Sequence, residues 1–505
     1  MSVKQKSLKS VRRSFSGDLH VAKQDLIHNH IVVLVHYDSV MGWRWLGIVI
    51  LQKLKHDRGT LTWSCLVQIL RNASYATIRL RKQEQRKNQI FQYAGEDAKG
   101  ADRIYVWGNA TTGALGIKTY LRPKRYGQHE ILTQKKPARL RFMDVHKFKV
   151  LDIACGYGFT VFAVKSNTGH KILGCGINSD SQIGFHEEPK NSGRILEYII
   201  QPAVIDLPQN DPATLRLKQV ACGRAHTLIL TDKHEVFSLG NNAYGQCGRG
   251  IVEGEIFSKK SSIYKIPSLP ENITKVVCGQ DHSFFLTETG EVFSCGLGAD
   301  GQTGLGHYKA TGIPSHVVGD IRGEKIIDIA SAADCVLAIS EKGDLFGWGN
   351  SEYSQLSAVT DATQVHTSRH LPFEKLGKIV KACAGGSICG ILNDQGQVFV
   401  WGFGILGKGP NLEMADFPTE IPPTLFGRNE LQTDTKVVDI KCGLSFYAAL
   451  TDKGDLYTWG KNKWGCLGLI YNKDQYFPLK VSLPAESKMV RCGVDHMVVL
   501  SKSYC

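Results

Sequence analysis

Apolar and polar positions recur along this chain in one small pattern that returns seven times. One half of the pattern is an apolar strand that ends in an aromatic or small residue followed by glycine, as at 104–109, and a turn with further glycines comes next. The strand-ending glycines are Gly108, Gly176, Gly240, Gly296, Gly349, Gly402 and Gly460. A unit of about fifty residues that repeats in this way predicts an array in which no unit buries its apolar face alone.

The other half of each unit is a strand that ends in Cys-Gly or in small-residue substitutes. The first residues of these pairs are Cys155, Cys222, Cys278, Ser331, Ala384, Cys442 and Cys492. An apolar run follows, then a tight turn, then a strand rich in β-branched and aromatic residues. In five units the Cys-type position lies twelve residues before the turn and eighteen before the strand-ending glycine. This spacing leaves room for two short strands and a hairpin.

Antiparallel strands at such even spacing, with glycine and aromatic motifs in each unit, predict an all-β fold, a seven-bladed β-propeller over roughly 100–502. The first Trp-Gly element, at 107–108, has no Cys-Gly strand before it, and the last Cys-Gly element, at 492–493, has no Trp-Gly strand after it. We therefore expect the N- and C-terminal strands to close one blade, which removes exposed sheet edges. The predicted domains are a basic extension at 1–99 and the propeller at 100–505.

The extension carries most of the net charge. Residues 1–99 hold 17 Lys/Arg and 7 Asp/Glu, a net +10, so only +4 of the total of +14 remains for the other residues. The first 17 residues contain five basic residues, five serines and no acid. Such a start is typical of a mitochondrial targeting segment, and a disordered basic tail that binds nucleic acid is the alternative.

Two further segments of the extension have an unusual composition. Residues 31–51 are apolar overall but broken by His36, Asp38 and Arg44. A membrane span needs about twenty largely uninterrupted apolar residues, so a span here is the less favoured prediction, and whether the stretch touches a membrane is left open. The stretch from Trp63 to Lys87 is apolar and then basic, which suits a second targeting segment, and the mature chain would then begin near 75–95.

Several motifs resemble catalytic or ligand-binding sites but are explained by the repeat. The runs 296–301 and 402–407 fit a dinucleotide fingerprint, yet both fall on the repeated glycine turn and lack a following helix. His226, His282 and His496 occupy one repeat slot on separate units, and we expect core or channel-lining histidines satisfied by backbone groups. The repeated cysteines lack C-x-x-C spacing and suit a crowded core. We predict no cofactor, no metal site and no enzyme activity.

The segments Leu-Gly-Asn-Asn-Ala-Tyr-Gly-Gln-Cys-Gly at 239–248 and Cys-Gly-Arg-Ala-His-Thr-Leu-Ile-Leu-Thr at 222–231 resemble the regulator of chromosome condensation repeat. With its presequence-like start, the chain most resembles the mitochondrial, guanine-exchange-factor-like member of that family. The resemblance implies nucleotide exchange on the dynamin-like GTPase of inner-membrane fusion. It also implies a role in a protein–RNA module that supports mitochondrial large-subunit rRNA and ribosome biogenesis. The implied location is the matrix or the matrix side of the inner membrane.

The nuclear exchange factor of this family uses an acidic residue two places after the Cys-type position of a repeat. The corresponding residues in this chain are Tyr157, Arg224, Gln280, Ala333, Gly386, Leu444 and Val494, and none is acidic. Asp281, Asp334 and Asp495 stand one place later, so these three and Arg224 are the candidate interaction residues. This departure argues against a simple transfer of the nuclear mechanism.

Partners expected from the resemblance are the GTPase, rRNA-processing proteins, mitochondrial rRNA and the inner-membrane periphery, with a monomeric propeller. The long inter-strand segments 117–148, 185–216 and 404–435 are candidate contact surfaces for a GTPase. Two alternatives stay open: a nuclear, chromatin-associated exchange factor for a Ras-like GTPase, and a pure protein-interaction scaffold.

Overall fold

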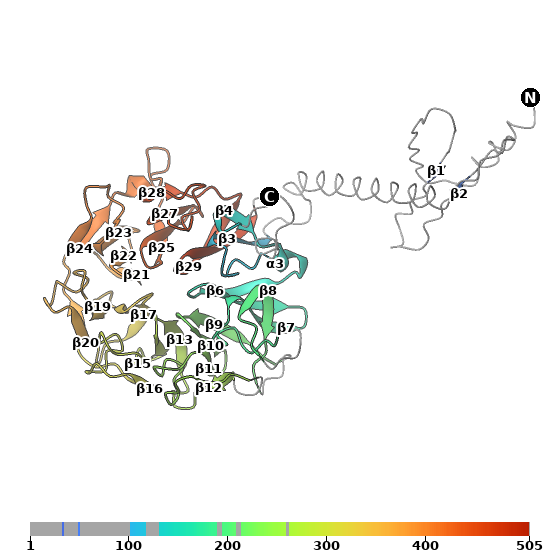
Figure 1. Cartoon of the computed structure of the whole chain (residues 1–505). Coiled ribbons are helices and arrows are strands. Elements are labelled where there is room, and N and C mark those ends of the chain that lie inside the picture. Colours follow the sequence, from blue (N-terminus) through green and yellow to red (C-terminus); the bar gives the residue numbers. More distant parts are fainter. Residues whose placement is uncertain are drawn as a thin grey trace, which may run out of the picture. The chain divides into compact units, whose positions relative to one another are not determined.

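The computed structural model describes residues 33–34, 49–50, 101–117, 131–188, 194–208, 214–258 and 262–503. Seven four-stranded antiparallel sheets follow one another in a ring (Figure 1). The prediction of a seven-bladed β-propeller is therefore confirmed. The first strand of each unit lies innermost (Figure 1). This strand ends in cysteine, serine or alanine, and such small side chains fit the crowded centre of the ring.

Four blades occupy the first part of the ring, each with its innermost strand first in chain order. They are β5 (Lys149–Cys155), β6 (Phe159–Ser166), β7 (Gly169–Ile177) and β8 (Tyr198–Ile205); β9 (Leu217–Cys222), β10 (His226–Thr231), β11 (Val236–Gly240) and β12 (Ile263–Lys265); β13 (Ile273–Cys278), β14 (His282–Thr287), β15 (Val292–Gly296) and β16 (Thr311–His316); and β17 (Ile326–Ala330), β18 (Cys335–Ser340), β19 (Leu345–Asn350) and β20 (Gln364–Leu371).

Three blades complete the ring. They are β21 (Ile379–Ala384), β22 (Ile388–Asn393), β23 (Val398–Phe403) and β24 (Met414–Ile421); β25 (Val437–Cys442), β26 (Phe446–Thr451), β27 (Leu456–Gly460) and β28 (Gln475–Lys480); and β29 (Ala485–Cys492), β30 (His496–Ser503), β3 (Asp102–Asn109) and β4 (Thr133–Arg139). Two short helices, α3 (Arg141–Val145) and η3 (Pro423–Phe426), lie in connections between blades.

Ring closure joins the two ends of the propeller in one sheet. Tyr105 on β3 pairs with Val499 on β30, and Leu500 on the same strand pairs with Met489 on β29. The last blade thus combines two C-terminal strands with two strands from the start of the propeller, as predicted. Because the sheet is continuous across this join, neither terminal segment leaves an inner strand unpaired.

Two glycines show why the repeat keeps glycine at two places. Gly108, at the end of β3, has φ +113°, and a Cβ there would lie 2.3 Å from the Asp495 carbonyl oxygen. Gly223 follows the Cys-type residue and packs against the ring of His226, and a Cβ at Gly223 would lie 2.2 Å from His226 Cε1. A side chain at either place would therefore displace the neighbouring strand or the buried ring.

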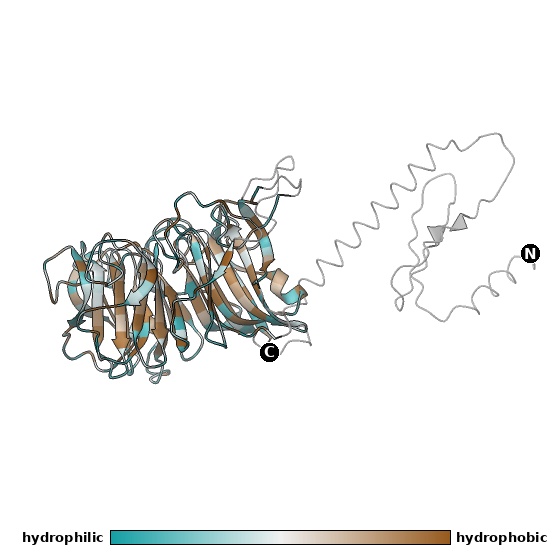
Figure 2. Cartoon of the chain, turned by 90° about the horizontal axis from the view of Figure 1, so that it is seen from below, coloured by the Kyte–Doolittle hydropathy of each residue, from teal (hydrophilic) through white to brown (hydrophobic). Residues whose placement is uncertain are grey.

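The core consists of apolar layers between neighbouring blades, which Figure 2 shows as brown strands. Tryptophans at the strand-ending position are fully buried in these layers. Three indole Nε1 groups donate to carbonyls of the preceding blade: Trp107 to Cys466 at 2.7 Å, Trp348 to Gln302 at 2.9 Å and Trp401 to Gln355 at 2.8 Å. Each such tryptophan adds a directed bond to a large buried area, so it fixes the angle between two blades.

The repeated histidines also join blades, but not as predicted. All three are fully buried, and their Nε2 atoms bond side-chain hydroxyls of the next blade rather than backbone groups. The pairs are His226 with Ser283 at 3.0 Å, His282 with Ser331 at 3.1 Å and His496 with Thr160 at 2.9 Å. The expectation of backbone partners was wrong because the neighbouring blade presents its hydroxyl directly opposite the ring.

The outermost strands of five blades share a proline inside a local bulge. These prolines are Pro137, Pro202, Pro314, Pro418 and Pro478, each within a register shift of the outer strand. Proline has no N–H to donate, and a bulge disrupts the ladder. The outer edges of these blades are therefore poor templates for pairing with another chain.

The three long segments predicted as contact surfaces are only partly loops. They contain the outer strands β4, β8 and β24, and the segments at 117–148 and 404–435 also contain α3 and η3. Their length reflects a fourth strand that the repeat pattern did not reveal. The glycine runs at 296–301 and 402–407 lie at the ends of β15 and β23 and in the turns that follow, in agreement with the sequence interpretation.

The extension is described at four residues, where β1 (Val33–Leu34) pairs with β2 (Val49–Ile50). The targeting segments at the start and at 63–87 lie outside the described residues, as does most of 31–51. Among the residues that the structure describes, no helix is long and apolar enough to cross a bilayer. The division at residue 99 stays a prediction.

Candidate functional site: an acidic face at the inner turns

The four candidate residues all lie in turns that join the first and second strands of a blade. Arg224, Asp281 and Asp334 belong to three consecutive blades, whose inner strands are β9, β13 and β17. Asp495 follows β29 and is separated from them by the blade of β5. The structure therefore brings three of the predicted residues together and leaves the fourth apart.

Arg224 and Asp281 form a two-pronged ion pair across two blades. Arg224 Nη2 lies 2.7 Å from Asp281 Oδ2, and Arg224 Nε donates to Oδ1 at 3.1 Å. Burial raises the pKa of Asp281, and Arg224 opposes this rise without cancelling it. The arginine side chain keeps 45% of its surface exposed whereas the aspartate keeps 3%. A partner can therefore reach the guanidinium and change its hold on the buried carboxylate.

Asp334 is the more perturbed carboxylate. It accepts a hydrogen bond from Gln302 Nε2 at 3.0 Å. Burial first, then Asp300 and Asp281, raise its pKa to about 6. Burial and the neighbouring carboxylates disfavour the ionised form of Asp334, so the turns that carry these carboxylates store unfavourable electrostatic energy near neutral pH. A positively charged partner group would relieve that energy.

Two loop carboxylates complete the acidic face. Asp180, after β7, accepts from Asn241 Nδ2 at 2.8 Å, and Asp300, after β15, accepts from Gln364 Nε2 at 2.7 Å. We use "acidic face" below for Asp180, Asp281, Asp300 and Asp334, with Arg224 as their cation. The strand-ending glycine motif supplies the loops, but no repeat rule predicts the carboxylates on them.

Tyr157 is a member of the site that the sequence pattern did not single out. Its hydroxyl donates to the Ala332 carbonyl at 3.1 Å, with Gln280 Oε1 at 3.3 Å as a second acceptor. Burial, Asp334 and Asp281 all raise the pKa of Tyr157, which keeps the phenol neutral. Because Ala332 lies three blades away, the tyrosine crosses the mouth of the central channel beside the acidic face. Its place two residues after Cys155 is the signal that could have drawn attention to it.

Asp495 holds the closing blade together. Asn109 Nδ2 donates to Asp495 Oδ2 at 2.6 Å, and His496 Nδ1 lies 3.3 Å from Oδ1. Burial alone would raise the pKa of Asp495, but His496 and Asn109 hold it below its ordinary value. Since Asn109 ends β3 and Asp495 precedes β30, the carboxylate fixes the join between the two ends of the ring. This position gives it a structural role.

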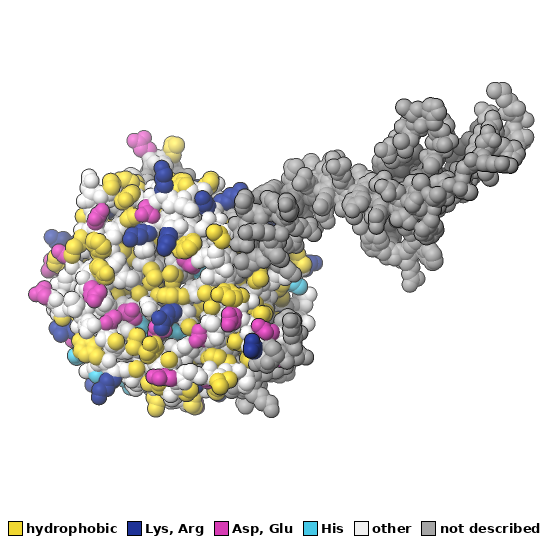
Figure 3. Space-filling model, viewed as in Figure 1, with side chains coloured by type: hydrophobic (Ala, Val, Ile, Leu, Met, Phe, Trp, Pro, Cys, Tyr) yellow, Lys and Arg dark blue, Asp and Glu magenta, His cyan; other side chains and the backbone are white. Residues whose placement is uncertain are grey.

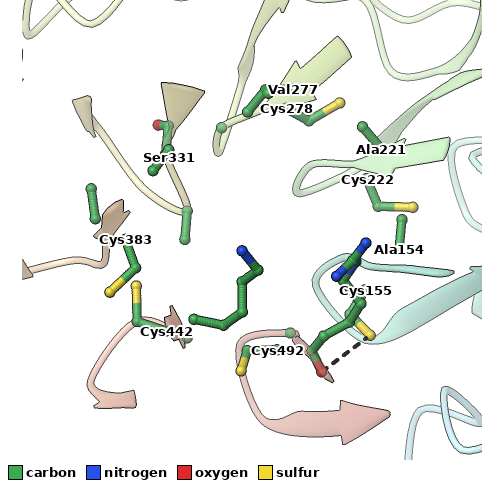
Figure 4. Close-up of a pocket in the computed structure, with 18 of the residues that line it drawn as sticks. Ala154, Cys155, Ala221, Cys222, Val277, Cys278, Ser331, Cys383, Cys442 and Cys492 are labelled. Carbon is green, nitrogen blue, oxygen red and sulfur yellow. Dashed lines mark hydrogen bonds between the residues drawn. The ribbon is translucent and has the colours of Figure 1, made fainter. Parts of the chain in front are cut away.

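The central channel encloses a cavity of about 470 Å³ lined by the inner strands and their repeated cysteines (Figure 4). The cysteines were expected in a packed core, and five of them instead form walls of this cavity: Cys155, Cys222, Cys278, Cys442 and Cys492. Burial raises the pKa of most of these thiols, which keeps them protonated and poorly nucleophilic. All twelve cysteines among the described residues are free thiols.

Charged residues that stand one or three places before Cys-type positions form a belt around the same channel. Asp152 pairs with Arg491 at 2.8 Å, Asp439 with Lys441 at 3.0 Å, and Asp328 with Lys275 and, at 3.8 Å, Lys381. Burial would raise the pKa of Asp328, but Lys275 and Lys441 hold it below the ordinary value. The belt largely neutralises itself, so it ties blades together. Within the described ranges no group of three or more His, Cys, Asp or Glu could hold a metal ion.

Family models match most of the propeller. The RCC1-like domain matches residues 98–428, and regulator of chromosome condensation (RCC1) repeats match 437–466 and 453–500. The chain belongs to the regulator of chromosome condensation family. It is 49% identical over 427 residues to the mouse protein named RCC1-like G exchanging factor-like protein, an alignment that covers 82% of this chain and 90% of that protein. The human protein of the same name is 49% identical over 421 residues.

Solved structures agree with this family assignment. The crystal structure of human WBSCR16 has a TM-score of 0.75 at 49% identity and covers 80% of this chain and all of that chain. The crystal structure of Prp20p from Saccharomyces cerevisiae, reported with its binding to Gsp1p and histones, has a TM-score of 0.63 at 20% identity. The match covers 82% of this chain and 94% of that chain, and at this identity it supports the fold alone. The chain is thus similar to mammalian RCC1-like exchange-factor-like proteins over its whole propeller.

Proposed function

We propose that this propeller promotes guanine-nucleotide exchange on a mitochondrial GTPase, the dynamin-like GTPase of inner-membrane fusion. The observation that carries the proposal is the acidic face, with Asp281 and Asp334 held at raised pKa values beside an exposed Arg224. The 49% identity to proteins named RCC1-like G exchanging factor-like supports the reaction class. The proposed location is the matrix or the matrix side of the inner membrane.

The mechanism is non-covalent. GTPases cradle the β- and γ-phosphates with a lysine of the phosphate loop. A carboxylate that pairs with such a lysine competes with the phosphates for it, and the acidic face repels the phosphates themselves. The face therefore binds the nucleotide-free GTPase more tightly than the loaded form, and this difference in affinity shifts the GTPase towards nucleotide release.

Arg224 sets the strength of this competition in the free propeller. Its guanidinium already occupies Asp281, so a partner lysine must displace it or share the carboxylate. An arginine fork holds a carboxylate more tightly than a lysine does. The pair thereby limits non-specific attachment of cations to the face. Asp334 is bonded to the neutral amide of Gln302, so it accepts the incoming charge first.

The test is release of fluorescently labelled GDP from the purified GTPase in the presence of the full chain. We expect faster release with the parent protein, and Asp334→Asn should slow release at least tenfold because it removes the charge and keeps the shape. Asp434→Asn, at an exposed aspartate outside the acidic face, is the matched control and should release GDP like the parent. No acceleration by the parent, or equal rates with Asp334→Asn, would contradict the proposal.

A role in the protein–RNA module of the mitochondrial large ribosomal subunit is the second candidate. The observation that favours it is the net charge of +10 on residues 1–99, which suits phosphate backbones. Crosslinking of the tagged full chain in organelles should recover large-subunit rRNA and rRNA-processing proteins. If neither is recovered while exchange activity is intact, this second role would be contradicted and nucleotide exchange would be the remaining proposed role.

A further inference from the structure

An exposed loop on the blade of β25–β28 combines apolar tips with lysines. The 461–474 loop joins β27 to β28 and is closed by Asn462, whose side chain donates to the carbonyls of Tyr471 and Lys473 at 2.8 and 3.1 Å. The loop also contacts the closing blade, because the Ile470 N–H donates to the Lys135 carbonyl on β4 at 2.8 Å. The loop and the start of β4 thus form one defined surface.

Ile470 is the most unusual residue of this surface. It has φ 75°, in the left-handed region that β-branched residues strongly avoid, and 70% of its surface is exposed. Strain of this kind persists only where the surroundings impose it and often marks a functional site. In this loop the strain turns an isoleucine outwards instead of into the core, where it would be stabilised by burial.

Other exposed apolar side chains lie on the same surface. Tyr471 follows Ile470 and is 37% exposed, while Ile131 and Leu132, just before β4, are 42% and 54% exposed. The three aliphatic side chains gain most from transfer into a hydrocarbon or another apolar phase and cannot stack on a nucleic-acid base. Tyr471 carries the one ring of these four side chains, and a tyrosine ring also suits the head-group level of a bilayer. The set therefore favours an apolar partner over RNA.

Lysines surround these apolar tips. They are Lys135, Lys136, Lys461, Lys463 and Lys473, all exposed. Among the described residues none of the five takes part in an ion pair shorter than 4.0 Å, and Asp474 is the acid within the loop. Figure 3 shows Lys and Arg side chains beside hydrophobic ones in the upper sector of the ring, around β27 and β28. The local charge is strongly positive although the whole propeller is nearly neutral.

We propose that the 461–474 loop and the start of β4 bind the surface of a bilayer that contains anionic phospholipid. Ile470, Tyr471 and Leu132 enter the boundary between head groups and acyl chains, and the lysines pair with the anionic head groups. Apolar insertion together with several lysines is the combination that gives stable peripheral attachment, since either contribution alone is weak. The inference needs no exchange activity, and the proposed inner-membrane location gives it a biological setting.

The experiment measures co-sedimentation of the full chain with phosphatidylcholine vesicles, with and without part of the lipid replaced by cardiolipin. The extension also carries positive charge and contributes a constant background, so paired variants are compared within the same full chain. The test triple is Lys461→Gln, Lys463→Gln and Lys473→Gln. The matched triple, at exposed lysines of other blades, is Lys233→Gln, Lys309→Gln and Lys378→Gln.

We expect the test triple to lower the partition coefficient on cardiolipin vesicles at least tenfold, since each lysine near an anionic surface adds about a fivefold factor at low salt. The matched triple should lower it about twofold or less. Equal losses with the two triples would overturn the proposal, because the attraction would then follow net charge and not this surface.

Ile470→Gly separates lipid insertion from a structural role. Glycine removes the strain, so the variant should melt at the parent temperature or above, yet bind cardiolipin vesicles roughly tenfold more weakly. Leu431→Ser, at a side chain that is 95% exposed in the connection between η3 and β25, should bind like the parent. Unchanged vesicle binding by Ile470→Gly, or a loss confined to a labelled single-stranded RNA or to self-association of the chain, would overturn the proposal.

Discussion

Replacing Asp334 by asparagine tests whether the acidic face stores electrostatic energy for function. Asn keeps the shape of the side chain and an oxygen that accepts the hydrogen bond from Gln302 Nε2. It removes the charge that burial disfavours most and that Asp300 and Asp281 also repel. We therefore expect Asp334→Asn to make the propeller more stable while it slows nucleotide exchange.

The size of the expected stabilisation follows from the raised pKa of Asp334. A rise from 3.8 to about 6 corresponds to about 3 kcal/mol for a fully buried group. Asp334 is half-buried, so solvent screening reduces the expected gain in the free energy of unfolding to about 1–2 kcal/mol. This gain is a sizeable fraction of the stability of an ordinary domain, which is about 5–15 kcal/mol.

The direction of this pKa shift determines how the effect of Asp334→Asn on stability changes with pH. With a raised pKa, folded Asp334 binds its proton more tightly than the unfolded chain does, so stability falls as the pH rises from about 4 to about 6. Below that window the carboxyl is protonated in both states and costs nothing. The advantage of Asp334→Asn should therefore be absent near pH 4, develop through the window and stay constant above it.

The assay is urea unfolding of the full chain, followed by tryptophan fluorescence at several pH values. Asp434→Asn is the control, because Lys453 lowers the pKa of Asp434 and its replacement should give no gain at any pH. A lower urea midpoint for Asp334→Asn at neutral pH would refute the reasoning. So would a gain that is already complete near pH 4.

Three further changes test other parts of the structure. Gly223→Ala places a Cβ against His226 and should lower the free energy of unfolding by about 1–3 kcal/mol, whereas Gly250→Ala, with open space around it, should leave the urea midpoint within error. Asp495→Asn should destabilise by about 1–2 kcal/mol at neutral pH, and the loss should shrink in acid because the pKa of Asp495 is lowered in the fold. In native protein, iodoacetamide should modify the buried Cys175 and Cys295 far more slowly than in urea, as peptide mass spectrometry can measure, and rapid native labelling of either would contradict their burial.

The fold was predictable because each repeat carries its own steric requirements. Gly223 must lack a side chain to admit the His226 ring, and Gly108 must adopt positive φ beside the Asp495 carbonyl. The strand-ending glycine has positive φ in all seven blades, and the glycine after the Cys-type residue is present in six, with Ala332 in its place in the blade of β17. The constraints are therefore visible as a period in the sequence. Ring closure followed from the two incomplete units at the ends, and the pairing of Tyr105 with Val499 confirmed it.

The outer strands were harder to predict from the same pattern. Five of the six bulged outer strands contain a proline, and proline in a run usually argues against a strand. The segments that contain β4, β8 and β24 therefore had the composition of long loops. Their strand character depends on the neighbouring strand and on a bulge that removes the proline from the ladder, and neither is a local property.

The site could be predicted only in part because its residues meet across blades. Tyr157 reaches Ala332, and Arg224 reaches Asp281, through distances set by the curvature of the ring and not by spacing in the chain. Asp495 shares the repeat position of Asp281 and Asp334 but lies beside Asn109 at the join, where it serves ring closure. The same repeat position thus has two roles, and the neighbouring blade decides which.

The backbone explains why the position two residues after the Cys-type residue varies so widely. Tyr157 N–H donates to the Gly223 carbonyl, Arg224 N–H to the Gln280 carbonyl and Gly386 N–H to the Leu444 carbonyl. These bonds link successive blades through main-chain atoms, so the fold places no demand on the side chain there. Tyrosine, arginine and glycine all satisfy it, and an acid would as well. The missing family acid is therefore compatible with exchange activity, provided that carboxylates reach the same face from elsewhere, as Asp281 and Asp334 do from the next residue in the turn.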